Sequence, residues 1–559
     1  LYSLHAENRG LLRWKDASFR SLPRRCCLTG LEQEPNLPSS LVGSLADADG
    51  LAYPKANTHS PEIAAMSYAK LDAHCRSLGA LEHALAILGT DEATNMAPGG
   101  GEQRAEAMAS LSGMHHRQAT APEVADWIEA AKAETLETEQ EIAVAELERS
   151  YVNMTCLPSD FVERKMRTSM RSEQLWRAAR PNGDWKAFEP ALQEVVEMTR
   201  EEAFLRADVL GLAPFDALME QFDPGNRTAS ITPVFEELKT FLVEFLPRAL
   251  EAQQQRHARR PLKALSGNYP VERQKALGIA MMKAVGFDMN HGSLSISDHP
   301  FCGGVPSDVR MTTRYRTDEF LSALMGILHE TGHGLYEQNL PKQWAHWPSG
   351  KARGMSIHES QSLFVEKQIG RNPAFWNFAL PLVDQHLQEN WTMEDLLPHV
   401  HLIQRGKIRV DADEVTYPLH VILRYELEQD LLSGKIEVKD LPEAWDAKMQ
   451  ASLGISTLDD PKNGPMQDVH WPSGAFGYFP SYTLGALMAA QQWAAIVKIN
   501  PDVDTQIAAG DFDAVNAWRR DNIWSKASTA STPDILRQAT GEGLNPAYFI
   551  AHLEARYGH

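Results

Sequence analysis

The stretch ILHETGHGLYEQ, residues 327–338, holds two histidines four residues apart with a glutamate directly after the first: His329, Glu330 and His333. Positions four apart lie on one face of an α-helix, so both imidazoles can point at a single metal ion. The carboxylate of Glu330 is then placed to take a proton from a metal-bound water. An exposed polar helix face is the alternative, but an apolar stripe on the same helix argues against it. The pattern therefore predicts a zinc site.

A catalytic zinc usually has three protein ligands and one open position. The class of zinc peptidases with a third histidine carries it where this chain has Asn339, so that class is excluded. A carboxylate from a following helix is the other common solution, and Glu359 lies 26 residues after His333. Thermolysin-type enzymes have aspartate four residues after this glutamate, where Leu363 stands here. On sequence spacing alone, Glu359 is one acidic residue among many.

The elements that must position these residues are mostly helices. Residues 66–255 show apolar positions at three- and four-residue steps, broken at 98–101, 181–183 and 223–225. Residues 293–316 are rich in Ser, Thr and β-branched side chains around a Gly-Gly turn, which predicts a small hairpin or sheet. The HExxH helix follows directly, with Thr317 or Asp318 as its cap, and helical patterns continue to the end except in a loop at 463–480.

Composition limits the classes of partner. The chain has 74 acidic and 54 basic side chains, and a formal net charge of −20 repels the phosphate backbone of nucleic acids. No run of about 18 uncharged apolar residues is present, so we expect no membrane span. The five cysteines are an odd number without a CxxC pair, which is typical of reduced thiols in the cytoplasm. Nucleic-acid and membrane partners are therefore not expected.

The first 65 residues differ from the rest. Residues 1–30 carry six basic and two acidic side chains, and residues 31–60 are rich in Pro, Ser, Gly and Asn. A basic leader can direct organelle import, but the first methionine is Met66. We predict that 1–65 is a poorly ordered extension outside a catalytic fold at 66–559. That fold has a helical part at about 66–260 and a zinc-site part at about 261–559.

Several blocks of the chain, taken in order, resemble a known family. They are HPF (299–301), DVRMTTRY (308–315), HExxH, the HESQS block around Glu359, IRVDADEVTYPLH (408–420) and MQDVHWPSGAFGYFPSYTLG (466–485). Together they resemble the carboxypeptidase Taq family of metallocarboxypeptidases, peptidase family M32. The resemblance covers 66–559.

The resemblance implies a ligand set and an architecture. His329, His333 and Glu359 would bind Zn²⁺, and Glu330 would act as general base. Co²⁺ or Mn²⁺ can substitute in such a site. The fold would be mainly α, a two-lobed helical body with a deep active-site cleft and a small β-sheet beside the HExxH helix. Members of this family typically form homodimers and release single C-terminal residues with broad specificity.

A carboxypeptidase must also recognise the free α-carboxylate of its substrate. Arginine suits this role because its planar fork binds a carboxylate through two hydrogen bonds. The family motif places this arginine at Arg409, and Arg310 and Arg314 are the alternatives. His358 and Asp308 are candidates for contacts behind the metal ligands.

Two residues of the last block resemble the His and Tyr that flank the zinc in neurolysin-like enzymes. These are His470 and Tyr482, twelve residues apart. We assign Tyr482 to the oxyanion and His470 to substrate orientation. Tyr478 could replace Tyr482 at the substrate, although packing in the core is the simpler role for it.

The sequence thus predicts a zinc carboxypeptidase that acts on peptides with a free C-terminus. An endo-oligopeptidase or a dipeptidyl carboxypeptidase is the alternative within peptidases. A non-catalytic peptide-binding protein is the alternative outside them, and the intact Glu330 and ligand set argue against it.

Overall fold

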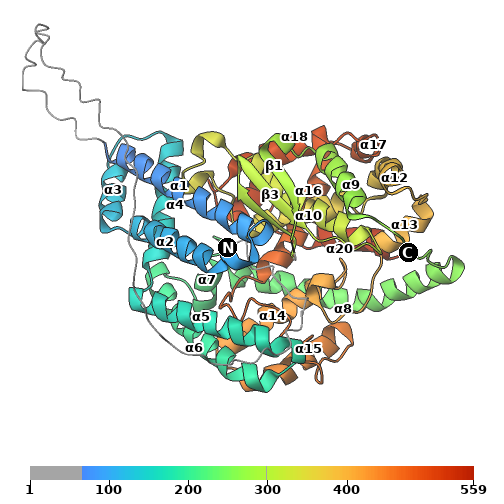
Figure 1. Ribbon diagram of the computed structural model, residues 1–559, viewed down its shortest axis with the longest axis horizontal. Helices are drawn as coiled ribbons and strands as arrows, with labels where there is room; N and C mark the ends of the chain where they lie inside the picture. The colour runs from blue at the N-terminus through green and yellow to red at the C-terminus, as the bar shows by residue number, and fades with distance from the viewer. Residues whose placement is uncertain (1–65, 298) are drawn as a thin grey trace, which may run out of the picture. The chain divides into compact units, whose positions relative to one another are not determined.

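The computed structural model describes residues 66–297 and 299–559, so the predicted extension at 1–65 lies outside the described residues. The described part is mainly helical with one small sheet, which confirms the predicted fold class (Figure 1). No helix within it is both long and apolar enough to cross a membrane. Cys75, Cys156 and Cys302 are free and buried.

The N-terminal half is built from nine helices within the described range. Helix α1 begins directly after Met66, as predicted, and the three predicted breaks fall between helices. The bounds are α1 (Ser67–Thr94), α2 (Gly101–Ala119), α3 (Pro122–Lys132), α4 (Thr138–Thr155), α5 (Ser159–Ala179), α6 (Trp185–Leu210), α7 (Pro214–Met219), α8 (Thr228–Arg259) and α9 (Val271–Ala284).

Three strands follow, β1 (Gly292–Ile296), β2 (Phe301–Val305) and β3 (Asp308–Thr313). The sheet order is β1-β3-β2, with β1 parallel and β2 antiparallel to β3. The prediction of a turn at the Gly-Gly pair was wrong, because the chain turns at residues 306–307 and both glycines lie inside β2. Gly304 has a φ of +85°, and a Cβ there would overlap the backbone oxygen of Asp308.

The helix that carries the HExxH motif, α10 (Leu321–Gln338), packs beside β3. Its apolar stripe is buried in the main core, which Leu324, Leu328 and Leu335 enter with at most 2% exposure. The predicted cap at Thr317 or Asp318 was wrong. The side chain of Glu319 instead accepts a hydrogen bond from the backbone N–H of Ser322.

The C-terminal half returns to helices. The predicted loop at 463–480 follows helix α15 (Leu441–Leu453) and ends where α16 (Pro480–Ile499) begins. Short 3₁₀ turns occur in both halves of the described chain, at Pro98–Gly100, Arg180–Asn182, Met289–His291, Lys342–Trp344, Pro348–Gly350, Arg409–Asp411, Val438–Asp440 and Trp524–Lys526. The helices are α11 (Met355–Leu363) with a π-helical continuation (Phe364–Ile369), α12 (Pro373–Leu387), α13 (Met393–Val400), α14 (Tyr417–Leu432), α15 (Leu441–Leu453), α16 (Pro480–Ile499), α17 (Val503–Ala508), α18 (Asp513–Asn522), α19 (Thr532–Thr540) and α20 (Ala547–Tyr557).

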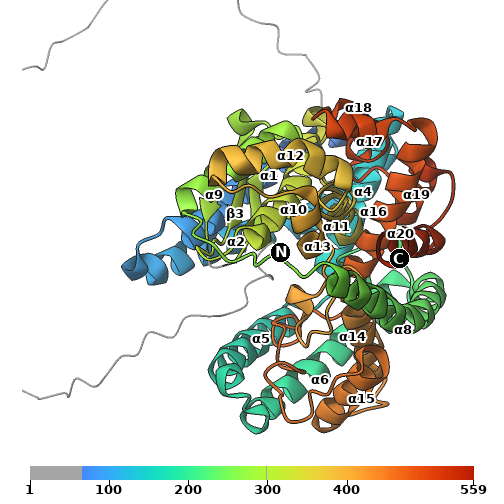
Figure 2. The same cartoon turned by 90° about the vertical axis from the view of Figure 1, so that its right-hand side faces the viewer.

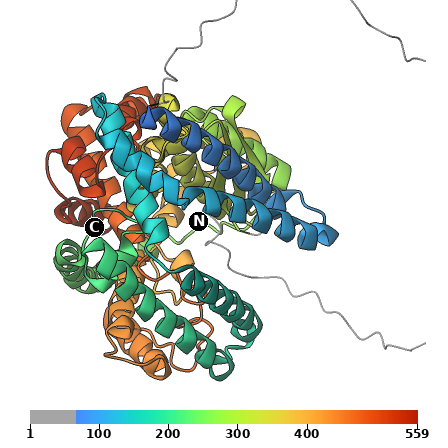
Figure 3. The same cartoon turned by 90° about the vertical axis from the view of Figure 1, so that its left-hand side faces the viewer.

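Within the described body, the helices gather in two groups. Figures 2 and 3 show α5, α6, α14 and α15 together, apart from the group that contains α10, α11 and α16. The two groups are joined where α14 packs against α16. Helix α11 lies between α10 and α16, so both neighbours fix its position.

Candidate metal centre

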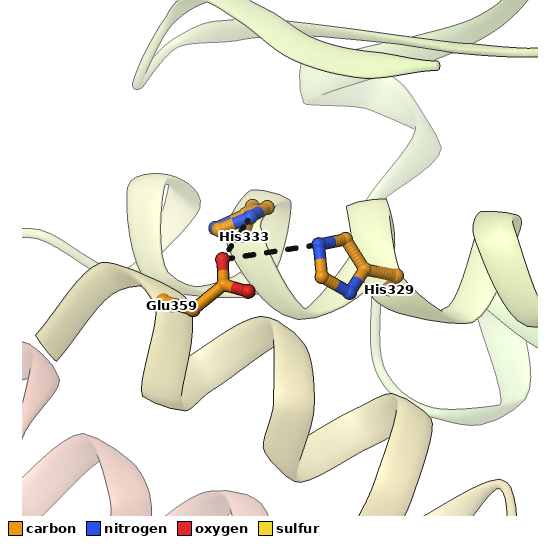
Figure 4. A group of neighbouring side chains, drawn as sticks. All are labelled: His329, His333 and Glu359. Atoms are coloured by element: carbon orange, nitrogen blue, oxygen red, sulfur yellow. Dashed lines mark ion pairs between the residues drawn. The ribbon is translucent and has the colours of Figure 1, made fainter. Parts of the chain in front are cut away.

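Two adjacent helices bring together the three predicted ligands. His329 and His333 project from α10 and Glu359 from α11, and all three point toward one another (Figure 4). Oε2 of Glu359 lies 3.5 Å from Nε2 of His333 and 3.9 Å from Nε2 of His329. One ligand atom from each residue lies within 4.8 Å of the others. Two imidazole nitrogens and a carboxylate oxygen are a donor set that suits a catalytic divalent metal.

The far side of each imidazole is also held. Nδ1 of His329 lies 3.0 Å from Oε2 of Glu366, and Nδ1 of His333 lies 2.5 Å from Nδ1 of His358. His358 in turn contacts Glu337 at 2.8 Å through Nε2. These contacts direct both Nε2 atoms toward Glu359. The prediction for His358 thus has a geometric basis, whereas Glu366, seven residues after Glu359, was missed.

Glu330 is buried beside the three ligands, with 6% of the residue exposed. Burial, together with the Glu359 and Glu366 carboxylates, raises the pKa of Glu330 to about 7 against an opposing effect of His329. A carboxyl group whose pKa lies near neutrality can both take and return a proton. Burial also lowers the pKa of His333 to about 3, so this imidazole is neutral and its lone pair is available to a metal.

Two glycines allow α11 to approach its neighbours. A Cβ at Gly332, inside the HExxH motif, would overlap the backbone oxygen of Gln361 and lie 2.5 Å from Cα of Ser362. A Cβ at Gly485 on α16 would lie 2.7 Å from Cβ of Glu359. Any larger side chain would push α11 away, so both glycines help to bring Glu359 to the histidines.

The residue where these helices meet is Gln361, which the sequence did not indicate. Its side-chain oxygen accepts hydrogen bonds from Nε of Arg519 (3.1 Å) and Nε1 of Trp524 (2.9 Å), and its backbone oxygen accepts another from Arg519 (3.1 Å). Its amide donates to Gln492 on α16. Arg519 is fully buried, and no carboxylate among the described residues pairs with it. Its cost of burial is offset mainly through Gln361 and two aromatic rings.

A second polar group surrounds Arg409. Nε and Nη2 of Arg409 donate to Oδ1 of Asp468 at 3.0 and 2.9 Å, and Nε of Arg424 donates to Oδ2 at 2.5 Å. The two guanidinium groups hold the pKa of Asp468 far below its usual range, against the effect of burial. Two arginines thus share Asp468 in a buried site.

Three tyrosines connect this group with the metal ligands. Nη1 of Arg409 donates to Oη of Tyr417 at 3.1 Å, and the Arg409 guanidinium lies 4.8 Å from the ring centre of Tyr482. Burial raises the pKa of Tyr417, Tyr478 and Tyr482, and the Glu359 carboxylate contributes to each rise. Nε2 of His470 lies 3.0 Å from Oη of Tyr482. Tyr417 was missed as a site residue, although it lies within the IRVDADEVTYPLH block.

The loop that carries His470 is fixed by Glu428 on α14. The Glu428 carboxyl group accepts hydrogen bonds from Nε1 of Trp471 (2.9 Å) and the backbone N–H of Gly477 (3.1 Å). Burial raises the pKa of Glu428 to about 8, with Asp468 adding to the rise.

Arg310 and Arg314 are not brought into this group. Arg310 pairs with Asp308 of its own strand at 2.7 Å, and Arg314 is exposed. Asp308 therefore holds an arginine and contacts no metal ligand. On the other side of the ligands, a cavity of about 910 Å³ reaches His358 and Glu337, with α1 and the β2–β3 turn among its walls.

Known proteins are similar to this chain along most of its length. Residues 70–557 match the family model described as carboxypeptidase Taq (M32) metallopeptidase. Thermostable carboxypeptidase 1 of Thermus thermophilus is 36% identical over 88% of this chain and 97% of that protein. Carboxypeptidase 1 of Bacillus subtilis is 32% identical over 85% and 95%. The solved structure of metallocarboxypeptidase 1 from Trypanosoma cruzi is 38% identical, with a TM-score of 0.86 over 88% of this chain and 99% of that one.

Proposed function

The chain belongs to the carboxypeptidase Taq (M32) family of metallopeptidases, and on that premise we propose a zinc-dependent carboxypeptidase that removes C-terminal residues with broad specificity. The observation that supports this proposal is the buried Arg409 guanidinium, which Asp468 orients beside Tyr417 and Tyr482. The Glu359 carboxylate helps to raise the pKa of both tyrosines, so they lie between this guanidinium and the metal ligands. A substrate carboxylate would pair with Arg409 next to those ligands.

His329, His333 and Glu359 would hold the metal, with Glu366 and His358 keeping the imidazoles in place. A bound Zn²⁺ supplies Lewis acidity that polarises the scissile carbonyl and lowers the pKa of water. Glu330 takes the proton from the attacking water and returns it to the leaving amine, for which a pKa of about 7 is suitable.

The side chains around the substrate have separate roles in this proposal. The Tyr482 hydroxyl donates a hydrogen bond to the oxyanion, and its contact with His470 holds it in place. Arg409 binds the α-carboxylate, and Asp468 keeps its guanidinium oriented. Tyr417 accepts a hydrogen bond from Arg409, so its own O–H is directed elsewhere and can donate to the same carboxylate. Tyr478 packs against Phe222 and supports Tyr482.

Several finer features belong to the same proposal. Zinc is the metal we propose, with Co²⁺ or Mn²⁺ as substitutes for this donor set. We propose residues 66–559 as the catalytic unit, a homodimer as the assembled form and the cytoplasm as its location. The substrates are peptides with a free C-terminus.

The test is one peptide offered with a free C-terminus and again with an amidated C-terminus. Mass spectrometry should show stepwise loss of single residues from the free form, inhibition by a chelator, and little cleavage of the amide. Equal cleavage of both forms would indicate an endo-oligopeptidase, and release of residue pairs would indicate a dipeptidyl carboxypeptidase.

The role of Glu330 is tested by Glu330→Gln, which keeps the size of the side chain and removes its basicity. We expect hydrolysis to fall at least about a hundredfold, because general acid–base catalysis contributes that much or more. Metal content measured on the same sample should be unchanged. Full activity in this variant would refute the mechanism, and an absence of hydrolysis by the unaltered chain would favour a peptide-binding protein.

A further inference from the structure

Glu414, five residues after Arg409, is buried against the last helix of the chain. Its carboxylate accepts hydrogen bonds from Nε2 of His552 (2.7 Å), Oη of Tyr557 (2.8 Å) and Nη1 of Arg556 (3.0 Å). All three donors lie on α20, and only 3% of Glu414 is exposed. Residues 409–416 are called the Arg409 segment below. Three donors on the buried Glu414 carboxylate fix this segment to α20.

Arg556 also holds the segment behind the metal ligands. Its Nη1 donates to the backbone oxygen of Lys367 at 2.7 Å, within the π-helical continuation of α11. The residue before Lys367 is Glu366, whose carboxylate contacts Nδ1 of His329. One guanidinium group therefore joins the Arg409 segment to the helix that orients a metal ligand. Helix α20 packs against α16, and Figure 2 shows both in the same group of helices.

The Arg409 segment has a second attachment that does not involve α20. Asp413 accepts hydrogen bonds from the backbone N–H groups of Gln404, Val415 and Thr416. Asp413 therefore shapes the segment locally, whereas Glu414 connects it to α20.

The charges around Glu414 make it hard to replace. Lys367, Arg371 and Arg556 are mostly buried, and the nearby carboxylates are those of Glu366, Glu414 and Asp413. Burial favours the protonated acid, but His552, Arg556 and Arg371 hold the pKa of Glu414 well below its usual range. Removing the Glu414 carboxylate would leave Arg556 without the one carboxylate that pairs with it among the described residues.

We propose that Glu414 is a positioning residue that sets the Arg409 segment and, through Arg556 and Lys367, the Glu366–His329 contact, so that α20 is part of the active-site framework. The inference rests on the proposed function, because it assigns substrate binding to Arg409 and metal binding to His329. Glu414 itself touches neither substrate nor metal in this proposal.

The test compares Glu414→Gln with Glu554→Gln, the same chemical change at an exposed position of α20. In Glu414→Gln we expect metal affinity, measured by chelator competition, to fall about tenfold, as for other residues behind metal ligands. KM for a free-terminus peptide should rise at least about threefold. The absorption spectrum of the Co²⁺-loaded protein should shift. Glu554→Gln should match the unaltered chain in all three measurements.

A merely structural role would lower the melting temperature but leave metal affinity, KM and the Co²⁺ spectrum of the folded fraction unchanged, and that result would overturn the proposal. If Glu414→Gln does not fold, Tyr557→Phe removes a single donor and should shift the same three quantities in the same direction, and no shift there would overturn it. If the unaltered chain binds metal but does not cleave peptides, the proposed function fails, whereas the metal-affinity comparison still decides on Glu414.

Discussion

Asp468 orients the proposed substrate-binding arginine, because it accepts hydrogen bonds from Arg409 and Arg424 at once. Turning either guanidinium group away would break a charged hydrogen bond inside the protein. The same logic applies at the metal centre, where Glu366 and His358 hold the two imidazoles from behind. Each reactive side chain is thus oriented by a charged or polar partner rather than by packing alone.

The first prediction concerns Arg409. In Arg409→Gln we expect KM for a free-terminus peptide to rise about tenfold or more, because one charge-assisted hydrogen-bonded pair with the substrate is lost. The preference over the amidated peptide should shrink by a similar factor. Steady-state kinetics with both peptides measure this. Arg310→Gln is the control, since Arg310 pairs only with Asp308, and an equal effect in the control would contradict the assignment.

A second prediction concerns Glu428. The unfolded chain releases this proton near the ordinary pKa of 4.5, whereas the folded protein keeps it until about pH 8. Between these values the folded state binds more protons, so this group's contribution to the free energy of unfolding falls as pH rises. From pH 6 to 8 the free energy of unfolding of the unaltered chain should fall by about 2 kcal/mol relative to that of Glu428→Gln.

Denaturant unfolding at several pH values measures this difference. The control is Glu426→Gln on the same helix. Lys239 and Lys448 lower the pKa of Glu426 against the effect of burial, so its contribution is already complete above about pH 5. A constant difference for Glu428→Gln across pH 6 to 8 would contradict the expectation.

The candidate metal centre depends on the position of helix α11, because this helix brings Glu359 to the two histidines of α10. Two glycines give it room, Gly332 on α10 and Gly485 on α16, and Gln361 ties it to Arg519 on α18. The distance from Glu359 to the histidines therefore depends on how α11 packs against α10 and α16. If α11 moved by a few tenths of an ångström, Glu359 would move with it, because close helix–helix packing transmits such shifts.

The third prediction compares two glycines of α10. A Cβ at Gly332 would meet the backbone of α11, which cannot move aside cheaply, so Gly332→Ala should cost about 1–3 kcal/mol of stability and weaken metal binding. A Cβ at Gly326 meets only Oγ1 of Thr313 at 3.8 Å. Gly326→Ala should therefore be neutral, or stabilising by up to about 1 kcal/mol. Thermal unfolding and chelator competition measure both, and similar losses in the two variants would exclude this explanation.

The sequence predicts those features of the site that depend on residues close together in the chain. The pairing of His329 with His333 is set by the helical repeat, so spacing alone predicts it. Glu359 was ambiguous without the family resemblance, because its distance to the histidines depends on how α11 packs. The Gly-Gly turn was misplaced for a similar reason. Gly304 is needed because a Cβ there would overlap the backbone oxygen of Asp308 on the neighbouring strand. The turn propensity of the Gly-Gly pair does not indicate this contact.

Contacts between segments far apart in the chain were not predictable at all. Glu414 meets α20 across 138 or more residues, and Arg519 meets Gln361 across 158. No pattern within a short window records such pairs. The overall fold was more accessible, since helical periodicity and the breaks at 98–101, 181–183 and 223–225 are local signals.

At the scale of the whole molecule, a metal at His329, His333 and Glu359 would join two helices whose packing extends through the main core. The fourth prediction follows from this linkage. Zn²⁺ present at about 100 times its dissociation constant should stabilise the folded protein by about 2.7 kcal/mol, and a chelator should reverse the gain. Differential scanning calorimetry measures the shift in melting temperature. Glu359→Gln should blunt it, and an undiminished shift would place the metal elsewhere.

The position of α20 has a consequence for how the protein is made. The metal ligands have all been synthesised once residue 359 is reached, but His552, Arg556 and Tyr557 emerge about two hundred residues later. At roughly 5–20 residues per second, translation needs on the order of 10 to 40 seconds to cover that stretch. During this interval the Arg409 segment lacks the helix that anchors it. On the proposal above, substrate binding and full metal affinity are therefore complete only after α20 has been synthesised.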